Sequence, residues 1–170
     1  MRPNTPISLN PTLTVSDVFK SPVTQRLLDY WREKAGDRPR PAWRDFKLMD
    51  IYDIASCVTV RDVVDGGREF RSRYCGTHVV SILGVELTGK LLSETYSAAG
   101  AAMMSERYHL VMRSDMPVRI VSFIRVVEKN LPTGYECIIL PLSGQDGTVG
   151  HLVSAFDFNY IPEEGEATRP

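Results

Sequence analysis

The sequence predicts an α+β fold: a five-stranded antiparallel sheet with central helices on one face and an N-terminal amphipathic helix on the other. An amphipathic segment precedes two stretches with alternating apolar residues, a helical middle follows, and three further alternating stretches close the chain. Short turn sequences join neighbouring stretches, and hairpin turns impose antiparallel pairing. We therefore expect a flexible segment and cap helix over 1–44, a folded domain over 45–160 and a flexible tail over 161–170.

The N-terminal helix begins at Ser21-Pro22, where the serine hydroxyl caps the first turn and proline needs no hydrogen bond. Leu27 and Trp31 fall on its apolar side, and Gly36 ends it. The prolines in residues 1–11 indicate a flexible lead-in.

The first two strands form a hairpin. Valines alternate with Thr59 and Arg61 in residues 58–64, and Asp-Gly-Gly follows at 65–67. The returning strand has one face formed by Phe70, Ser72 and Tyr74.

The middle of the chain is helical. A short apolar turn at 77–83 ends at Gly84, and a longer helix runs over 99–114. It ends before Met116-Pro117, because the residue that precedes a proline is disfavoured in helical conformation.

Three strands follow, within 118–127, 135–142 and 149–158, and they carry apolar residues on both faces. Each exposed apolar side chain would forfeit roughly 1.5–3 kcal/mol of burial, so we expect both faces to be covered. The residues that we assign to the cap on the second face, or to a dimer contact, are Leu27, Trp31, Val121 and Phe123.

The composition argues against nucleic-acid binding and against a membrane protein. Lys and Arg total 20 against 21 Asp and Glu, which argues against nucleic-acid binding through phosphate neutralisation. Apolar runs fall far short of the roughly 20 residues that span a bilayer, and residues 1–10 contain no secretory signal, so we expect no membrane partner. Three widely spaced cysteines indicate reduced thiols in a cytoplasmic protein.

Catalytic and cofactor motifs are absent from the sequence, including HExxH, GxSxG and GxGxxG. His109 falls opposite Met104 and Tyr108 on its helix, so we expect it to face solvent rather than to ligate a haem. His78 is expected to cap a turn. We therefore expect no metal site and no required cofactor, neither haem nor flavin.

Two hydroxyls stand within apolar strand faces, Ser72 and Ser122. They either bond to nearby backbone or line an apolar ligand cavity between the sheet and the helices. The candidate pocket residues are Phe70, Ser72, Tyr74, His78, Ile82, Ile120, Ser122 and Ile124.

Three segments together resemble a PAS domain, in particular the stand-alone, single-domain bacterial PAS proteins. Residues 71–84 look like a strand that runs into the first short PAS helix, and the G-x-x-x-x-G-K sequence at 84–90 is similar to the following connection. Residues 141–158, with Ala-Phe-Asp-Phe at the end, look like the closing hairpin. Two departures are Gly76-Thr77, where an asparagine is common, and Pro162, which interrupts any continuing signalling helix.

The resemblance implies a cytoplasmic signalling protein, either a sensor or a protein-interaction domain, without an output domain of its own. It would bind a small ligand between sheet and helices and act through a signalling partner or a homodimer, without catalysis. Three alternatives stay open: a small enzyme using Tyr74 and His78 as acid and base, a haem sensor using His78 or His109, and an interaction module without a ligand.

Overall fold

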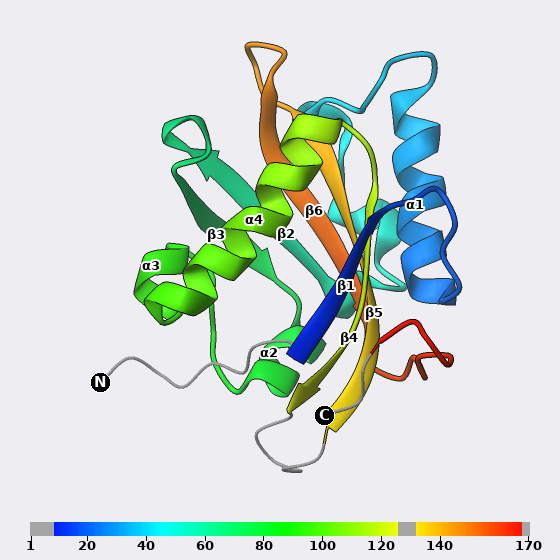
Figure 1. Cartoon of the computed structure of the whole chain (residues 1–170). Helices are drawn as coiled ribbons and strands as arrows, with labels where there is room; N and C mark the ends of the chain where they lie inside the picture. The colour runs from blue at the N-terminus through cyan, green and yellow to red at the C-terminus, as the bar shows by residue number, and fades with distance from the viewer. Residues whose placement is uncertain (1–8, 126–131, 168–170) are drawn as a thin grey trace.

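One antiparallel sheet carries helices on both faces in the computed structural model, which describes residues 9–125 and 132–167 (Figure 1). The strands are β1 (Leu9–Val15), β2 (Val58–Val64), β3 (Glu69–Cys75), β4 (Val118–Arg125), β5 (Pro132–Ser143) and β6 (Val149–Asp157). The helices are α1 (Pro22–Ala35), α2 (Thr77–Leu83), α3 (Leu92–Thr95) and α4 (Ala98–Ser114), with short 3₁₀ turns before β2 and between β2 and β3. No helix in these ranges is long and apolar enough to cross a bilayer.

The sheet has six strands in the order β1-β4-β5-β6-β2-β3, one more than the sequence predicted. The extra strand is β1, within the segment expected to be a flexible lead-in, and it pairs Leu13 with Ile120 and Val15 with Val118. Pairing with β1 satisfies backbone groups that β4 would otherwise expose at an edge. Pro11 does not prevent this, because the register of β1 on β4 is irregular between Leu9 and Thr12 and proline is tolerated at such irregularities of an edge strand.

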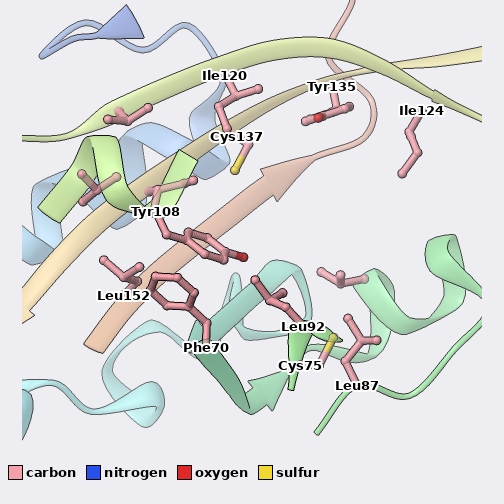
Figure 2. Packing of buried hydrophobic residues seen from close by; sticks show 14 of the residues in the cluster. Phe70, Cys75, Leu87, Leu92, Tyr108, Ile120, Ile124, Tyr135, Cys137 and Leu152 are labelled. Carbon is pink, nitrogen blue, oxygen red and sulfur yellow. The ribbon is translucent and has the colours of Figure 1, made fainter. Parts of the chain in front are cut away.

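The inner face of the sheet is covered by α2, α3 and α4. Figure 1 shows α4 running across this face, at the predicted place in the chain. Figure 2 shows the rings of Phe70 and Tyr108 side by side in the core beneath it, with centroids 4.8 Å apart. Val111 of α4 and Ile120 and Ile139 of the sheet belong to the same buried cluster.

The outer face is covered by α1 from the same chain, as predicted (Figure 1). Leu27 and Leu28 are completely buried against β5 and β6. Trp31 is buried beside them, and its indole Nε1 donates a hydrogen bond of 2.8 Å to the carbonyl of Pro141. Ser21 caps α1 by accepting a hydrogen bond from the N–H of Val23.

An irregularity between β2 and β3 changes which face their side chains occupy. Val60 pairs with Tyr74, yet the next residue, Arg61, pairs with Ser72, so Arg73 is an extra residue in β3. Such a bulge breaks the alternation of side chains along a strand. Tyr74 packs at the outer cluster while Phe70 lies in the inner one, which corrects the expectation that they share a face.

Glu136 joins α1 to the sheet although its side chain is completely buried. Its carboxylate accepts hydrogen bonds from the backbone N–H of Lys20 at 3.1 Å and of Ser21 at 2.7 Å. The hydroxyl of Thr24 and Nε of Arg119 donate to it at 2.5 Å each. A buried charge is tolerated when it is paired and hydrogen-bonded in this way.

The residues after β6 also pack on the protein, although we expected 161–170 to be a flexible tail. Glu166 accepts hydrogen bonds from Nη2 of Arg119 at 3.0 Å and from the hydroxyl of Tyr160 at 2.5 Å. It also accepts a hydrogen bond of 2.9 Å from the N–H of Glu163 and lies 3.0 Å from Nζ of Lys20. The end of the described chain is therefore tied to the residues that also hold the start of α1.

Replacing Glu136 with Gln should lower the free energy of unfolding by about 2–4 kcal/mol, because the variant leaves Arg119 with a weakened partner in a buried position. Urea denaturation measures the change. Glu33→Gln, at a carboxylate with 70% of its side chain exposed, is the matched control and should be nearly neutral. Equal stability of the two variants would contradict the role given to Glu136.

The Glu166 cluster should produce a pH-dependent part of the stability. Burial alone raises the pKa of Glu166, but hydrogen bonds from Tyr160, the N–H of Glu163, Lys20 and Arg119 outweigh it and lower the pKa to about 2. Because the folded pKa lies below the ordinary value of 4.5, this contribution is complete above pH 4.5 and is lost as the pH falls through 2.

We therefore expect Glu166→Gln to be less stable than the wild type at neutral pH, with the difference shrinking between about pH 4.5 and 2. Denaturation curves at a series of pH values measure this difference. A gap that stays constant down to pH 2 would show that the carboxylate charge contributes nothing.

Candidate functional site

A small cavity of about 50 Å³ lies between the inner face of the sheet and the helices that cover it. Most of its lining is apolar or aromatic, with a few polar groups. The lining residues are Thr59, Arg61, Val79, Leu83, Leu87, Tyr96, Met104, Arg107, Tyr108, Ile124, Tyr135, Phe156 and Phe158. Apolar walls with few polar groups are typical of small-molecule sites.

Two elements supply the charged groups of the cavity. Arg61 comes from β2, where it pairs with Ser72 beside the bulge, so its side chain lies on the inner face. Arg107 comes from the middle of α4, whose start is fixed by a hydrogen bond from the N–H of Gly100 to the Ser97 hydroxyl. The cavity is therefore bounded by one cation on the sheet and one on the helix layer.

Both arginines are buried, each with 3% of its surface exposed. In the described part of the chain, Nε and Nη1 of Arg61 and Nε of Arg107 have no hydrogen-bond partner. Nη2 of Arg107 approaches Sδ of Met103 at 3.4 Å, but a thioether is only a weak acceptor. Buried donors without partners are rare in folded proteins, so these three need an explanation.

Phenols and thiols lie beside these arginines. The phenols of Tyr96 and Tyr108 approach Arg61, but neither accepts a hydrogen bond from its Nε or Nη1. Burial raises the pKa of the Tyr96 phenol and, despite the opposing effect of Arg61, that of the Cys75 thiol to about 11. Burial likewise raises the pKa of the Cys137 thiol, near Arg107. None of these three groups supplies a negative charge at neutral pH.

The charge of Arg61 persists in this setting. Burial alone lowers the pKa of Arg61, but the nearby phenols of Tyr108 and Tyr96 outweigh it and the pKa lies above its ordinary value. Among the described residues, neither Arg61 nor Arg107 has a carboxylate within ion-pair distance. The cavity therefore holds two positive charges without a counter-ion from the chain that the structure describes.

An open groove of about 830 Å³ near the β5–β6 turn provides a contrast. Four arginines line it, and each has a carboxylate within 4.0 Å, including Arg44, whose Nε lies 4.0 Å from Asp45. The other pairs are Arg38 with Asp45, Arg40 with Asp115 and Arg73 with Asp62. The groove is wider than the inner cavity, but its cations are largely neutralised.

Of the eight candidate pocket residues, Ile124 lines the cavity. Phe70 and Ile120 lie in the inner core without lining it. Ser72 is buried with its hydroxyl unpartnered among the described residues. Ser122 is also buried, and its hydroxyl approaches the carbonyl of Phe123 at 3.4 Å.

The other three candidates are not part of the cavity lining. The hydroxyl of Tyr74 donates a hydrogen bond of 3.0 Å to the carbonyl of Ala55, on the outer side of the bulge. His78 packs with its ring edge against Phe158, which does line the cavity. Ile82 packs, half-buried, against the inner core. Their part in ligand binding stays a prediction.

The four cap or dimer candidates are all buried. Leu27 and Trp31 belong to the cluster beneath α1, whereas Val121 and Phe123 belong to neither main cluster. A dimer contact through any of them stays a prediction.

His109 is half-buried under the β2–β3 hairpin instead of lying on an open solvent face, which corrects its sequence-based placement. Its Nε2 lies 2.7 Å from the carbonyl of Gly67, and its ring packs 5.7 Å from that of Phe70. The helical periodicity placed it opposite the main apolar stripe, but the β2–β3 hairpin folds over that side of α4. His109 thus joins the hairpin to the helix. The described residues contain no group of three His, Cys, Asp or Glu side chains able to hold a metal.

The sequence interpretation missed Arg61 and Arg107, although it contained signals for both. Arg107 stands three residues after Met104 and four before Val111, within the apolar stripe of α4. Arg61 alternates with valines in a sheet whose faces are both covered. A charged residue in either position must be buried, which marks it as a candidate for binding.

A comparison with protein families identifies the domain type. A family model described as "PAS domain" matches residues 19–156, and its match includes α1. A solved structure titled "Structure of an RNA-binding Light-Oxygen-Voltage Receptor" has a TM-score of 0.49 and 14% identity, and the match covers 89% of this chain. The chain spans 39% of the length of that receptor. Among the curated proteins, nothing matches the chain.

Replacing Arg61 with Met should stabilise the ligand-free protein by about 1–4 kcal/mol, because it removes a buried charge and keeps an apolar side chain of similar length. Urea denaturation of exhaustively dialysed protein measures the change. Arg71→Met, on the exposed side of β3, is the matched control and should change little. A large loss of stability in the Arg61 variant would mean that the guanidinium has a structural partner.

Proposed function

Because the chain belongs to the PAS domain family, we propose that it is a regulatory sensor that binds a small molecule in the cavity between β2 and α4. One observation carries the proposal: a small cavity between the sheet and the helices has mostly apolar walls and is lined by two buried arginines with unpartnered donors among the described residues. A core that served packing alone would gain stability by replacing these groups with apolar ones. Their presence is consistent with a site kept for binding.

A ligand in this cavity would contact both layers of the domain at once. Arg61 belongs to the sheet and Arg107 to the helix layer, so an occupant that binds both favours one packing of α4 on the sheet. The same helix holds the β2–β3 hairpin through His109 and Gly67. A change in the position of α4 would therefore reach the hairpin at the edge of the sheet.

We propose that the output is passed to a signalling partner or through a homodimer, in the cytoplasm and without catalysis. The positions of Tyr74 and His78 support regulation over catalysis, since the two residues pack against different parts of the structure and neither lines the cavity. For the same reason haem is not part of the proposal: neither His78 nor His109 lines the cavity.

Native mass spectrometry of freshly purified protein tests the proposal, since it reports bound small molecules and the number of subunits together. We expect a bound mass on the wild type that is lost in Val79→Phe, where the larger side chain fills the cavity. Val80→Phe, on the same helix but outside the lining, is the matched control and should keep the ligand.

Near-UV circular dichroism must show that both variants fold. A wild-type protein without any bound mass, and without a thermal shift from a small-molecule library, would contradict the sensor function.

A further inference from the structure

We infer that the occupant of the cavity is a small organic anion, a short-chain carboxylate whose oxygens are held between Arg61 and Arg107. The inference rests on the proposed function and adds the chemical class of the ligand. It goes beyond the family assignment, because it depends on two side chains of this particular sequence.

The charge of the cavity favours an anion. Two guanidinium groups line one cavity, and the described residues place phenols, thiols, a thioether, the hydroxyls of Thr59 and Ser72 and apolar groups around them, but no carboxylate at ion-pair distance. A buried charge without a counter-ion is strongly unfavourable. An anion that enters the cavity supplies the missing charge, which a neutral ligand cannot do.

Hydrogen bonding is the second argument. Nε and Nη1 of Arg61 and Nε of Arg107 are three buried donors without acceptors in the described structure. A carboxylate offers acceptor sites on two oxygens and matches the fork of a guanidinium. One such group can therefore satisfy donors from the sheet and from the helix layer together.

The size and walls of the cavity define the rest of the ligand. A volume of about 50 Å³ has room for about three to five groups of the size of a water molecule, which corresponds to a carboxylate that carries one or two further carbons. Val79, Leu83 and Met104 form apolar walls that suit this chain. An inorganic oxyanion would match the arginines but would leave these walls without an apolar partner.

Isothermal titration calorimetry of the dialysed full chain tests the inference with sodium propanoate, its neutral analogue propanamide, sodium phosphate and sodium chloride. We expect saturable binding of propanoate, together with a rise in Tm, and weaker or no binding of the other three. Arg61→Met and Arg107→Met should each weaken propanoate binding at least about tenfold, since each removes a charge-assisted hydrogen-bond donor. Arg61→Lys should bind propanoate with intermediate affinity, because lysine keeps the positive charge but lacks the planar guanidinium that can donate two parallel hydrogen bonds.

The control Arg71→Met should bind propanoate like the wild type. Equal binding of propanoate and propanamide, or unchanged binding by both arginine variants, would overturn the anion inference. Tighter binding of phosphate than of propanoate would overturn the carboxylate assignment.

The failure of the inference can be separated from that of the proposed function. A neutral molecule found on the protein by native mass spectrometry, together with no propanoate binding, would overturn the anion inference and leave the sensor function intact. No binding of any probe, together with an unliganded native mass, would overturn both.

Discussion

The sheet is apolar on both faces, and this constraint underlies the rest of the structure. If either face were exposed to water, its apolar side chains would lose the free energy gained by burial. The chain must therefore cover both faces. Helices α2 to α4 form one layer and α1 forms the other (Figure 1). Glu136 holds the second layer in place, because its buried carboxylate binds the backbone at the start of α1 and pairs with Arg119. Helix α1 is thus an integral part of the domain.

The same constraint explains how a charged residue comes to line the cavity. On a sheet with one solvent-exposed face, Arg61 could point into solvent and would be an ordinary surface residue. Here both faces are covered, and the bulge at Arg73 keeps Arg61 and Ser72 together on the inner face while Tyr74 turns outward. The neighbouring helix α4 brings Arg107 to the same cavity. Two positive charges therefore line one cavity without a carboxylate at ion-pair distance among the described residues, and this is the observation on which the proposed ligand rests.

The candidate site was predicted only in part. Its location between the sheet and the helices followed from the element order and from the PAS resemblance, and Ile124 of the candidate residues lines it. The face assignment of Tyr74 failed because strict alternation does not include a bulge. The predicted placement of His109 was wrong because helical periodicity describes the faces of one helix only. It does not report that the β2–β3 hairpin packs on the face that carries His109. Arg61 and Arg107 were overlooked because a charged residue is ordinarily assigned to solvent unless its neighbours show that no solvent is available.

The sequence by itself determined the fold class, the positions of the main helices and the need for a cap on the second face. These features follow from local signals: alternation, turn residues, caps and the total of apolar side chains. Only the tertiary structure decided that residues 9–15 add a sixth strand, that Glu136 clamps α1, and that two arginines share one cavity. These features depend on contacts between residues far apart in the chain. A linear pattern of polar and apolar residues does not show which distant residues come into contact.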